Sequence, residues 1–191
     1  MKRIVIFASG SGTNAENISR FFKQSSLASV VHILTNNKNA KVLNRSKKLK
    51  INSLCFGRKE FLSEDKMLKF LKKEADLIIL AGFLWKIPTH IIEAFPNKII
   101  NIHPALLPKY GGKGMYGMNV HRAVVENKES ETGITIHYVN ENYDEGSIIF
   151  QAKTPILPSD SSEDVAKKIH LLEQEHFPKV IEDLIKDDID G

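Results

Sequence analysis

The sequence predicts an α/β fold in which a mostly parallel, twisted sheet carries helices on both faces and an antiparallel strand pair near its C-terminal edge. Three observations support this prediction. Short apolar runs rich in β-branched residues alternate with helix-like segments through residues 1–107, which is typical of a parallel sheet covered by helices. The first run ends directly in a glycine-containing turn. Two longer strand-like runs joined by a short loop follow in the second half, and they indicate an antiparallel pair.

The predicted elements are short and well separated. The expected strands of the first half are residues 3–7, 29–35, 52–56, 76–80 and 98–102, and the expected helices are residues 14–24, 40–48, 59–74 and 89–94. In the second half we expect a glycine-rich loop over residues 110–117, a helix over 120–126, strands over 133–139 and 147–155, and a helix over 161–186. That last helix begins where Ser161, Ser162, Glu163 and Asp164 supply capping hydroxyls and first-turn carboxylates. No linker or repeat interrupts the chain, so residues 1–191 are predicted to form a single domain.

Length and composition are those of a globular protein. The chain has 191 residues, of which 42% are hydrophobic and 26% charged, and its formal net charge is +4. The basic residues are not accompanied by a recognition motif, so we expect no nucleic-acid partner, while a modest positive field favours anionic small molecules. No apolar stretch reaches the roughly 20 residues that span a bilayer. The single cysteine, Cys55, is expected in a buried strand and excludes an internal disulfide, so we expect a cytoplasmic protein.

Polar side chains follow the apolar strand over residues 98–102. Asn101 and His103 are two residues apart and therefore project from the same face of the strand end, and Pro104 stops the ladder there. An asparagine amide offers donors and an acceptor, and a histidine exchanges a proton near neutral pH. The pair suits a reaction in which an oxyanion develops and a proton moves. The same residues also fit a structural role at a strand end.

A third polar group, Asp144, lies in the loop between the two long strands of the second half. A carboxylate close to His103 would orient its imidazole and stabilise the protonated form. Glu145 and Gly146 follow Asp144 and mark a turn, so for Asp144 taken alone a solvated turn residue is the favoured interpretation.

The turn after the first strand reads Ser9-Gly-Ser-Gly-Thr-Asn14 and leads at once into a helix. Its glycines permit a tight turn, and free N–H groups at a helix start attract anions such as phosphate. The turn lacks the Lys-Ser/Thr of the Walker pattern and the third glycine of the dinucleotide fingerprint. This motif alone is compatible with phosphate binding and with a plain strand-to-helix connection.

Five motifs resemble those of one enzyme family in their order and spacing. They are Ser9-Gly-Ser-Gly-Thr-Asn14, Ala81-Gly-Phe83, Asn101-Ile-His-Pro-Ala-Leu-Leu-Pro-Lys-Tyr110, Gly133-Ile-Thr-Ile-His137 and Asp144-Glu-Gly146. The chain is similar over nearly its whole length to the phosphoribosylglycinamide formyltransferases, folate-dependent enzymes of purine biosynthesis. The resemblance implies a Rossmann-like formyltransferase fold. It also implies a phosphate-binding half over residues 1–107, and a half over residues 108–191 that carries the folate site and the C-terminal helix.

The resemblance implies roles for individual residues. Asn101, His103 and Asp144 match the catalytic trio of the family, and Gly12, Thr13 and Asn14 match the loop that receives the ribose phosphate. Glu173 matches a carboxylate that contacts the substrate, and Arg58 falls near a basic position that does so in relatives. The pterin of the folate would lie, held largely by backbone groups, along Leu84, Trp85, Ile87, Val139, Asn140 and Glu141.

Two departures from the family pattern affect these roles. An arginine is common in relatives where Trp85 stands here, so the family offers no role for this side chain. Many relatives also have a shorter, histidine-containing loop before His121, where this chain has Met115-Tyr116-Gly117-Met118. His121 and His137 match family positions, and we interpret them as loop and sheet support.

The implied reaction is transfer of a formyl group from the co-substrate 10-formyltetrahydrofolate to the amine of phosphoribosylglycinamide by direct attack. We expect only small-molecule substrates as partners, no membrane association, and a monomer or homodimer. No metal is expected, because the remaining histidines are scattered without ligand spacing; they are His32, His90, His170 and His176.

Three alternatives stay open. A formyltetrahydrofolate hydrolase shares the Asn, His and Asp but usually carries an additional N-terminal regulatory domain. A methionyl-tRNA formyltransferase shares the Leu-Leu-Pro segment but carries a C-terminal domain for tRNA. We expect neither extension here. A non-catalytic nucleotide-binding module would explain the glycine turn, but it would give no function to Asn101, His103 and Asp144.

Overall fold

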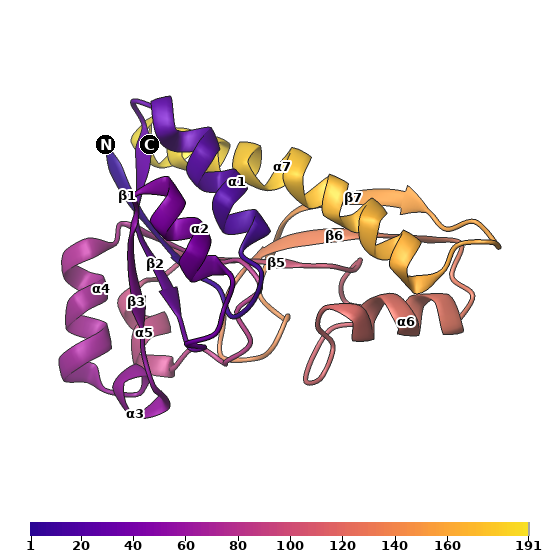
Figure 1. Cartoon of the computed structure of the whole chain (residues 1–191), viewed down its shortest axis with the longest axis horizontal. Coiled ribbons are helices and arrows are strands. Elements are labelled where there is room, and N and C mark those ends of the chain that lie inside the picture. The colour runs from indigo at the N-terminus through magenta and orange to yellow at the C-terminus, as the bar shows by residue number, and fades with distance from the viewer. Residues whose placement is uncertain (191) are drawn as a thin grey trace.

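A seven-stranded mixed sheet forms the centre of the computed structural model, which describes residues 1–190 (Figure 1). Its strands are β1 (Lys2–Phe7), β2 (Ala28–Thr35), β3 (Asn52–Cys55), β4 (Leu77–Leu80), β5 (Ile99–His103), β6 (Glu131–Tyr138) and β7 (Ile148–Pro155). Their spatial order is β3-β2-β1-β4-β5-β6-β7. The strands β1 to β5 pair in parallel, and β6 and β7 extend the sheet in antiparallel pairing. The predicted fold class and each predicted strand are confirmed, with small shifts at the strand ends.

Alternate residues of the central strand β1 face two different cores. Ile4 and Ile6 belong to one apolar cluster, Val5 and Phe7 belong to the other, and all four are buried. Successive side chains of a strand point to opposite faces. A strand that is apolar on both faces therefore requires helices on both sides of the sheet.

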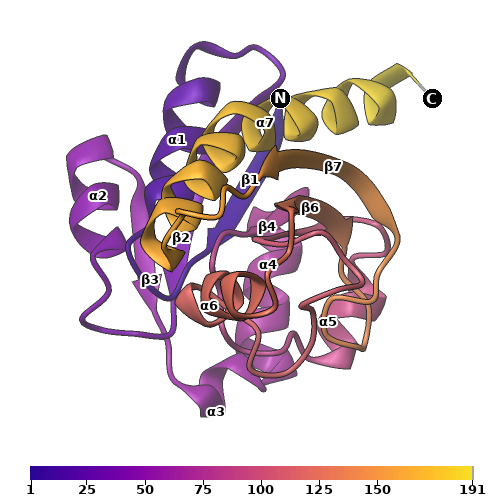
Figure 2. The ribbon, with the colours of Figure 1, turned by 90° about the vertical axis from the view of Figure 1, so that its right-hand side faces the viewer.

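The helices cover both faces, as predicted (Figures 1 and 2). The helices α1 (Thr13–Phe21), α2 (Val42–Leu49) and α7 (Ser162–Asp190) supply buried residues to the cluster of Ile4 and Ile6. The helices α4 (Lys69–Glu74) and α5 (Thr89–Ala94) supply them to the cluster of Val5 and Phe7. The remaining long helix, α6 (Met118–Glu126), packs against α7. None of the helices within residues 1–190 is long and apolar enough to cross a membrane.

The single helix predicted over residues 59–74 is wrong. The chain forms α3 (Arg58–Phe61), a π-helical turn (Glu64–Leu68) and then α4, with an extended Ser63 between the first two (φ −85°, ψ 120°). The break has a packing reason. Phe61 and Met67 are both buried, but residues six apart lie on different faces of a continuous helix. The extended residue allows both side chains to reach the same apolar cluster.

The prediction that Cys55 is buried is also wrong. Cys55 does lie in β3, but β3 is an edge strand, and all four of its residues are exposed. A strand with a neighbour on only one side is covered less completely than a central one. The position of β3 in the sheet, and not the local sequence, therefore decides the exposure of this cysteine.

The strand order places a crevice at the carboxyl end of β1. The chain leaves β1 toward β2 and β3 on one side, and later returns to β4 and β5 on the other side. Such a reversal is where ligands bind in open α/β sheets. The loops after β1 and β4 are joined at their base by backbone bonds from Ala81 N to Phe7 O (2.9 Å) and from Ser9 N to Gly82 O (3.0 Å), so the two walls of the crevice are held together.

Replacing Gly133 in β6 with alanine should destabilise the protein. A Cβ at this position would clash with the backbone oxygen of Ala152 on the neighbouring strand β7, so the strands would have to shift, at a cost of about 1–3 kcal/mol in the free energy of unfolding. Urea unfolding followed by circular dichroism measures this cost. Gly10→Ala is the matched control, because no atom lies within 4 Å of its Cβ position. Equal stability of the two variants would contradict the prediction.

Candidate functional site

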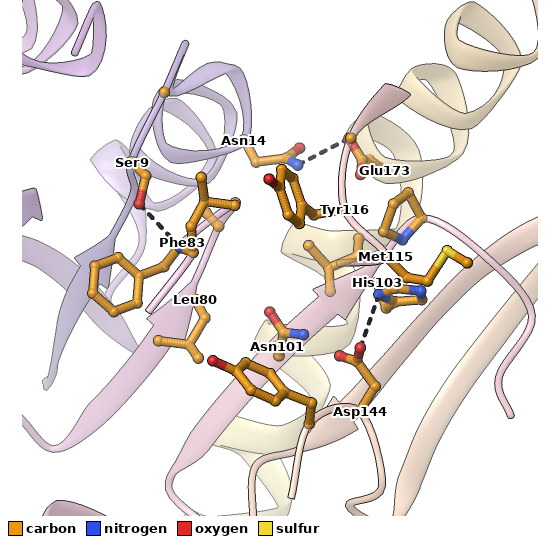
Figure 3. Close-up of a pocket in the computed structure, with 18 of the residues that line it drawn as sticks. Ser9, Asn14, Leu80, Phe83, Asn101, His103, Met115, Tyr116, Asp144 and Glu173 are labelled. Atoms are coloured by element: carbon orange, nitrogen blue, oxygen red, sulfur yellow. Dashed lines mark hydrogen bonds and ion pairs between the residues drawn. The ribbon is translucent and has the colours of Figure 1, made fainter. Parts of the chain in front are cut away.

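A cavity of about 590 Å³ lies at the carboxyl ends of β1, β4 and β5. Its wall is formed by the turn after β1, the loop after β4, the end of β5, the loop before α6, the loop between β6 and β7, and one face of α7. Asn14, Asn101, His103, Asp144 and Glu173, which are far apart in the sequence, all line it (Figure 3). The structure therefore brings the predicted catalytic trio and most of the predicted substrate residues into one space.

The turn after β1 presents the start of a helix to this cavity. Gly12 has a left-handed backbone (φ 73°, ψ 24°), which glycine adopts without strain, and a Cβ there would clash with the Val42 side chain. No side chain caps α1, so the N–H groups of its first turn keep their capacity to bind a ligand. The partial positive charge of the helix start adds to that capacity. This end of the cavity can therefore hold an anion.

The Asn14 side chain joins α1 to α7. Its Nδ2 donates to Glu173 Oε2 (3.0 Å) (Figure 3), and its Oδ1 accepts from Gln174 Nε2 (2.9 Å). The oxygen and one N–H of the amide are engaged with α7, so Asn14 offers a ligand its backbone N–H and its second amide N–H. The Nδ1 atom of His170 lies 3.7 Å from Glu173 Oε2, and this carboxylate raises the pKa of His170. A histidine with a raised pKa thus borders the anion-binding end.

His103 is buried between two hydrogen-bond acceptors. Its Nε2 lies 2.7 Å from the carbonyl oxygen of Tyr110, and its Nδ1 lies 3.6 Å from Asp144 Oδ2. A carbonyl oxygen only accepts, so Nε2 carries a proton, and the carboxylate favours a second proton on Nδ1. Burial lowers the pKa of His103, while the charge of Asp144 and the Tyr110 carbonyl oppose that shift. The protonation of this ring is therefore sensitive to any charge that enters the cavity.

Asp144 is largely buried among groups that stabilise its negative charge. Its Oδ2 accepts a hydrogen bond from Gly112 N (2.9 Å), and its Oδ1 lies 3.6 Å from His137 Nε2. Burial alone would raise the pKa of Asp144, but His137, His103 and the Gly112 N–H lower it below its ordinary value. The side chain is only 12% exposed. The solvated turn residue that the sequence left open is thus excluded.

Asn101 is held by a chain of hydrogen bonds through His137. Asn101 Nδ2 lies 3.1 Å from His137 Nε2, and His137 Nδ1 lies 2.8 Å from the carbonyl oxygen of Tyr138. Because that carbonyl only accepts, Nδ1 carries a proton, and Nε2 faces both the Asn101 amide and Asp144 Oδ1. Asn101 and His137 are direct partners in the β5–β6 pair. The arrangement orients the amide and leaves its second N–H for a ligand.

Both predicted folate segments reach the cavity, although two predicted residues do not line it. The lining residues from these segments include Leu84, Trp85, Ile87, Val139 and Asn140. Glu141 and the predicted substrate residue Arg58 are not among the lining residues. The guanidinium of Arg58 instead lies over the Trp85 ring, 5.6 Å from its centroid, so Arg58 reaches the cavity only through this tryptophan.

Sequence reasoning gave no binding role to Tyr116, His121 and His170, which also line the cavity. His121 is buried, burial lowers its pKa, and its Nδ1 has no hydrogen-bond partner within the described chain. The spacing of His170 and Glu173, three apart on one helix face, could have indicated His170. No local pattern indicates the other two. Within residues 1–190 no group of three or more His, Cys, Asp or Glu side chains is arranged to hold a metal ion.

Comparison of the sequence with known proteins gives one consistent result. Residues 2–181 match the family described as formyl transferase. The chain is 38% identical over 182 residues to the chloroplastic phosphoribosylglycinamide formyltransferase of Arabidopsis thaliana, covering 92% of this chain and 62% of that protein. It is 36% identical to the phosphoribosylglycinamide formyltransferase of Haemophilus influenzae, covering 95% of this chain and 86% of that one. The chain thus spans less than two thirds of the plant relative.

Solved structures lead to the same group. Glycinamide ribonucleotide transformylase 1 from Symbiobacterium toebii superposes with a TM-score of 0.88 at 30% identity, covering 98% of this chain and 89% of that one. The enzyme of the same name from Geobacillus kaustophilus superposes with a TM-score of 0.87 at 36% identity, covering 97% and 99%. The structural similarity therefore extends over nearly the whole chain.

Asp144→Asn should lower the pKa of His103 further. The variant keeps the shape of the side chain but removes the opposite charge that favours the imidazolium, so at a given pH near neutrality a smaller fraction of His103 is protonated. An NMR titration of the histidine ring resonances in both proteins measures this difference. His170, whose pKa Glu173 raises, serves as the internal reference. Identical His103 titrations would mean that Asp144 and His103 are not coupled.

Proposed function

The chain belongs to the formyl transferase family, and from that membership and the geometry of the cavity we propose that it formylates phosphoribosylglycinamide. The donor would be 10-formyltetrahydrofolate, and the reaction would be a step of purine biosynthesis. One observation carries the proposal: a single cavity holds a helix start suited to an anion at Gly12 and, farther along it, the group Asn101, His103 and Asp144 (Figure 3).

The shape of the substrate suits this layout. Phosphoribosylglycinamide carries a phosphate at one end and a primary amine at the other. With the phosphate at the start of α1, the amine can lie toward the end of β5, where the polar trio is. A non-catalytic nucleotide-binding module needs the anion-binding helix start but does not need the polar trio.

In the proposed mechanism the neutral amine attacks the formyl carbon directly. Its lone pair forms the new carbon–nitrogen bond, and the formyl oxygen becomes an oxyanion. The second N–H of Asn101 and the protonated His103 stabilise this charge. The bond from carbon to N10 of the folate then breaks, and the proton lost by the amine passes to N10, directly or through water.

Asp144 supports the reaction through His103. Its carboxylate stabilises the imidazolium from the Nδ1 side, at 3.6 Å. The proton on Nε2, which the Tyr110 carbonyl accepts (2.7 Å), is the one that an oxyanion would share. The developing negative charge adds to that of Asp144, so the proton affinity of His103 rises as the intermediate forms. No covalent intermediate is required, and the single cysteine, Cys55, is not among the residues that line the cavity.

The phosphate would be bound by backbone N–H groups of Gly12, Thr13 and Asn14, because the Asn14 side chain is already engaged with α7. Glu173, fixed by that same bond, would contact the sugar part of the substrate. Arg58 stays a predicted substrate contact, and it would have to leave the Trp85 ring to make one.

The pterin would lie between two segments, Leu84, Trp85 and Ile87 on one side and Val139, Asn140 and Glu141 on the other. Ser9 Oγ already accepts a hydrogen bond from the Leu84 N–H (3.0 Å). The first segment therefore offers the folate its carbonyl oxygens and its remaining amides. Recognition through the backbone tolerates a tryptophan where relatives carry arginine.

The proposal includes a cytoplasmic location and small-molecule partners alone, with no nucleic acid, membrane or metal. It is compatible with a monomer or a homodimer, since the residues assigned to the reaction all come from one chain.

Deformylation of 10-formyltetrahydrofolate should depend on the amine. The absorbance change of the folate should be rapid with phosphoribosylglycinamide and close to the uncatalysed rate without it, because the amine is the attacking group. Equal rates with and without the amine would assign the protein to hydrolysis, and no reaction in either case would assign it to binding alone.

Asn101→Ala and His103→Ala should each lower kcat by about 100- to 1,000-fold, the usual effect of losing an oxyanion donor. The affinity for either substrate should change little, because both groups act on charge that develops in the transition state. The double variant should lose less than the product of the two effects, since both act on one oxyanion. Steady-state kinetics measures these effects, with Cys55→Ser as the control variant. A His103→Ala variant that keeps most of its turnover would contradict the mechanism.

A further inference from the structure

The loop over residues 112–117 forms part of the cavity wall, and the proposed reaction assigns no substrate contact to it. The loop has a defined path. Gly112 N donates to Asp144 Oδ2 (2.9 Å), Asn119 Nδ2 donates to the Gly114 oxygen (3.1 Å), and Met115 packs against a small buried cluster at the start of α6. At its end Gly117 has a backbone (φ 51°, ψ −133°) that residues with side chains rarely adopt.

These anchors present Tyr116 to the cavity. Its neighbour Met115 packs against the buried cluster and also lines the cavity, while Tyr116 lines the cavity and is 51% exposed. In Figure 3 the ring projects into the cavity, toward Asn14 and away from Asp144. The phenol oxygen of Tyr116 makes no hydrogen bond to the described part of the chain.

The chemistry of this side chain fits the anion-binding end of the cavity. A tyrosine ring offers a rigid apolar face, and its hydroxyl offers a donor. The carbon–hydrogen face of a sugar can pack on such a ring, and a phosphate oxygen can accept from such a hydroxyl. Ligand cavities commonly combine apolar lining with a few polar groups of this kind.

We propose that Tyr116 is a specificity-determining residue for the sugar phosphate end of the amine substrate. Its ring packs on the ribose, and its hydroxyl donates to the phosphate held at the start of α1. The identity of the substrate rests on the proposed function, whereas the recognition of a sugar phosphate can be tested without it.

Calorimetric titration of the full chain with two probes separates the ring from the hydroxyl. Inorganic phosphate tests the hydroxyl alone, so Tyr116→Phe and Tyr116→Ala should weaken its binding equally, by about 10- to 100-fold for one hydrogen bond to a charged group. Ribose 5-phosphate also tests the ring. Its binding should weaken by the same factor in Tyr116→Phe and by a further 5-fold or more in Tyr116→Ala.

Two control variants accompany the titrations. Tyr143 is 43% exposed and lines the cavity beside Asp144, so Tyr143→Ala should leave ribose 5-phosphate binding unchanged. Lys113 lies on the same loop as Tyr116 and also lines the cavity. If Tyr116→Ala binds ribose 5-phosphate as the wild type does and only Lys113→Met binds it more weakly, the proposal is overturned, because the loop would then act through the charge of Lys113. Equal losses in Tyr116→Ala and Tyr143→Ala would overturn it as well.

Steady-state kinetics connects the inference to the reaction. The KM for phosphoribosylglycinamide should rise in Tyr116→Ala, while the KM for 10-formyltetrahydrofolate and kcat stay within about 2-fold of the wild type. A rise in the folate KM alone would overturn the assignment of Tyr116 to the sugar phosphate. A wild-type protein that does not transfer formyl groups would refute the proposed function, and weakened ribose 5-phosphate binding by the variants would still support the role of Tyr116.

Discussion

The buried carboxylate of Asp144 is the group on which the geometry of the site depends. Placing a charge in a largely buried position is costly unless it is paired and hydrogen-bonded. Here the charge faces His103 on β5, His137 on β6 and the Gly112 N–H of the loop before α6. These partners come from three segments of the chain, so the pairing of β5 with β6 and the path of the loop both have to be correct before Asp144 is satisfied.

The same contacts determine what each histidine can do. His137 directs one nitrogen to a carbonyl and the other to Asn101, so it orients the amide. His103 lies between the Tyr110 carbonyl and Asp144, so burial favours the neutral ring while these partners favour the protonated ring. A negative charge that appears next to His103 shifts this balance toward the protonated form of the ring. In the proposed reaction this favours the oxyanion over the neutral carbonyl of the substrate.

The sequence predicted what local patterns determine. Apolar runs indicated every strand, and the glycine turn with the Asn101 and His103 pair indicated both ends of the cavity. What was missed depends on non-local contacts. The orienting role of His137 needs the register that places it opposite Asn101. The break before the π-helical turn needs the packing of Phe61, and the exposure of Cys55 needs the order of the strands. None of these is encoded within a few residues of the position concerned.

The glycine-rich loop connects the two ends of the cavity. Gly112 holds the Asp144 carboxylate, and Tyr116, four residues later, projects toward Asn14 at the start of α1. The segment between them is anchored by Met115 and by the Asn119 side chain, so the path of this one loop places both groups. At one end its N–H helps to keep Asp144 ionised, and at the other its tyrosine borders the start of α1. Both ends of the cavity therefore depend on the correct folding of one backbone segment.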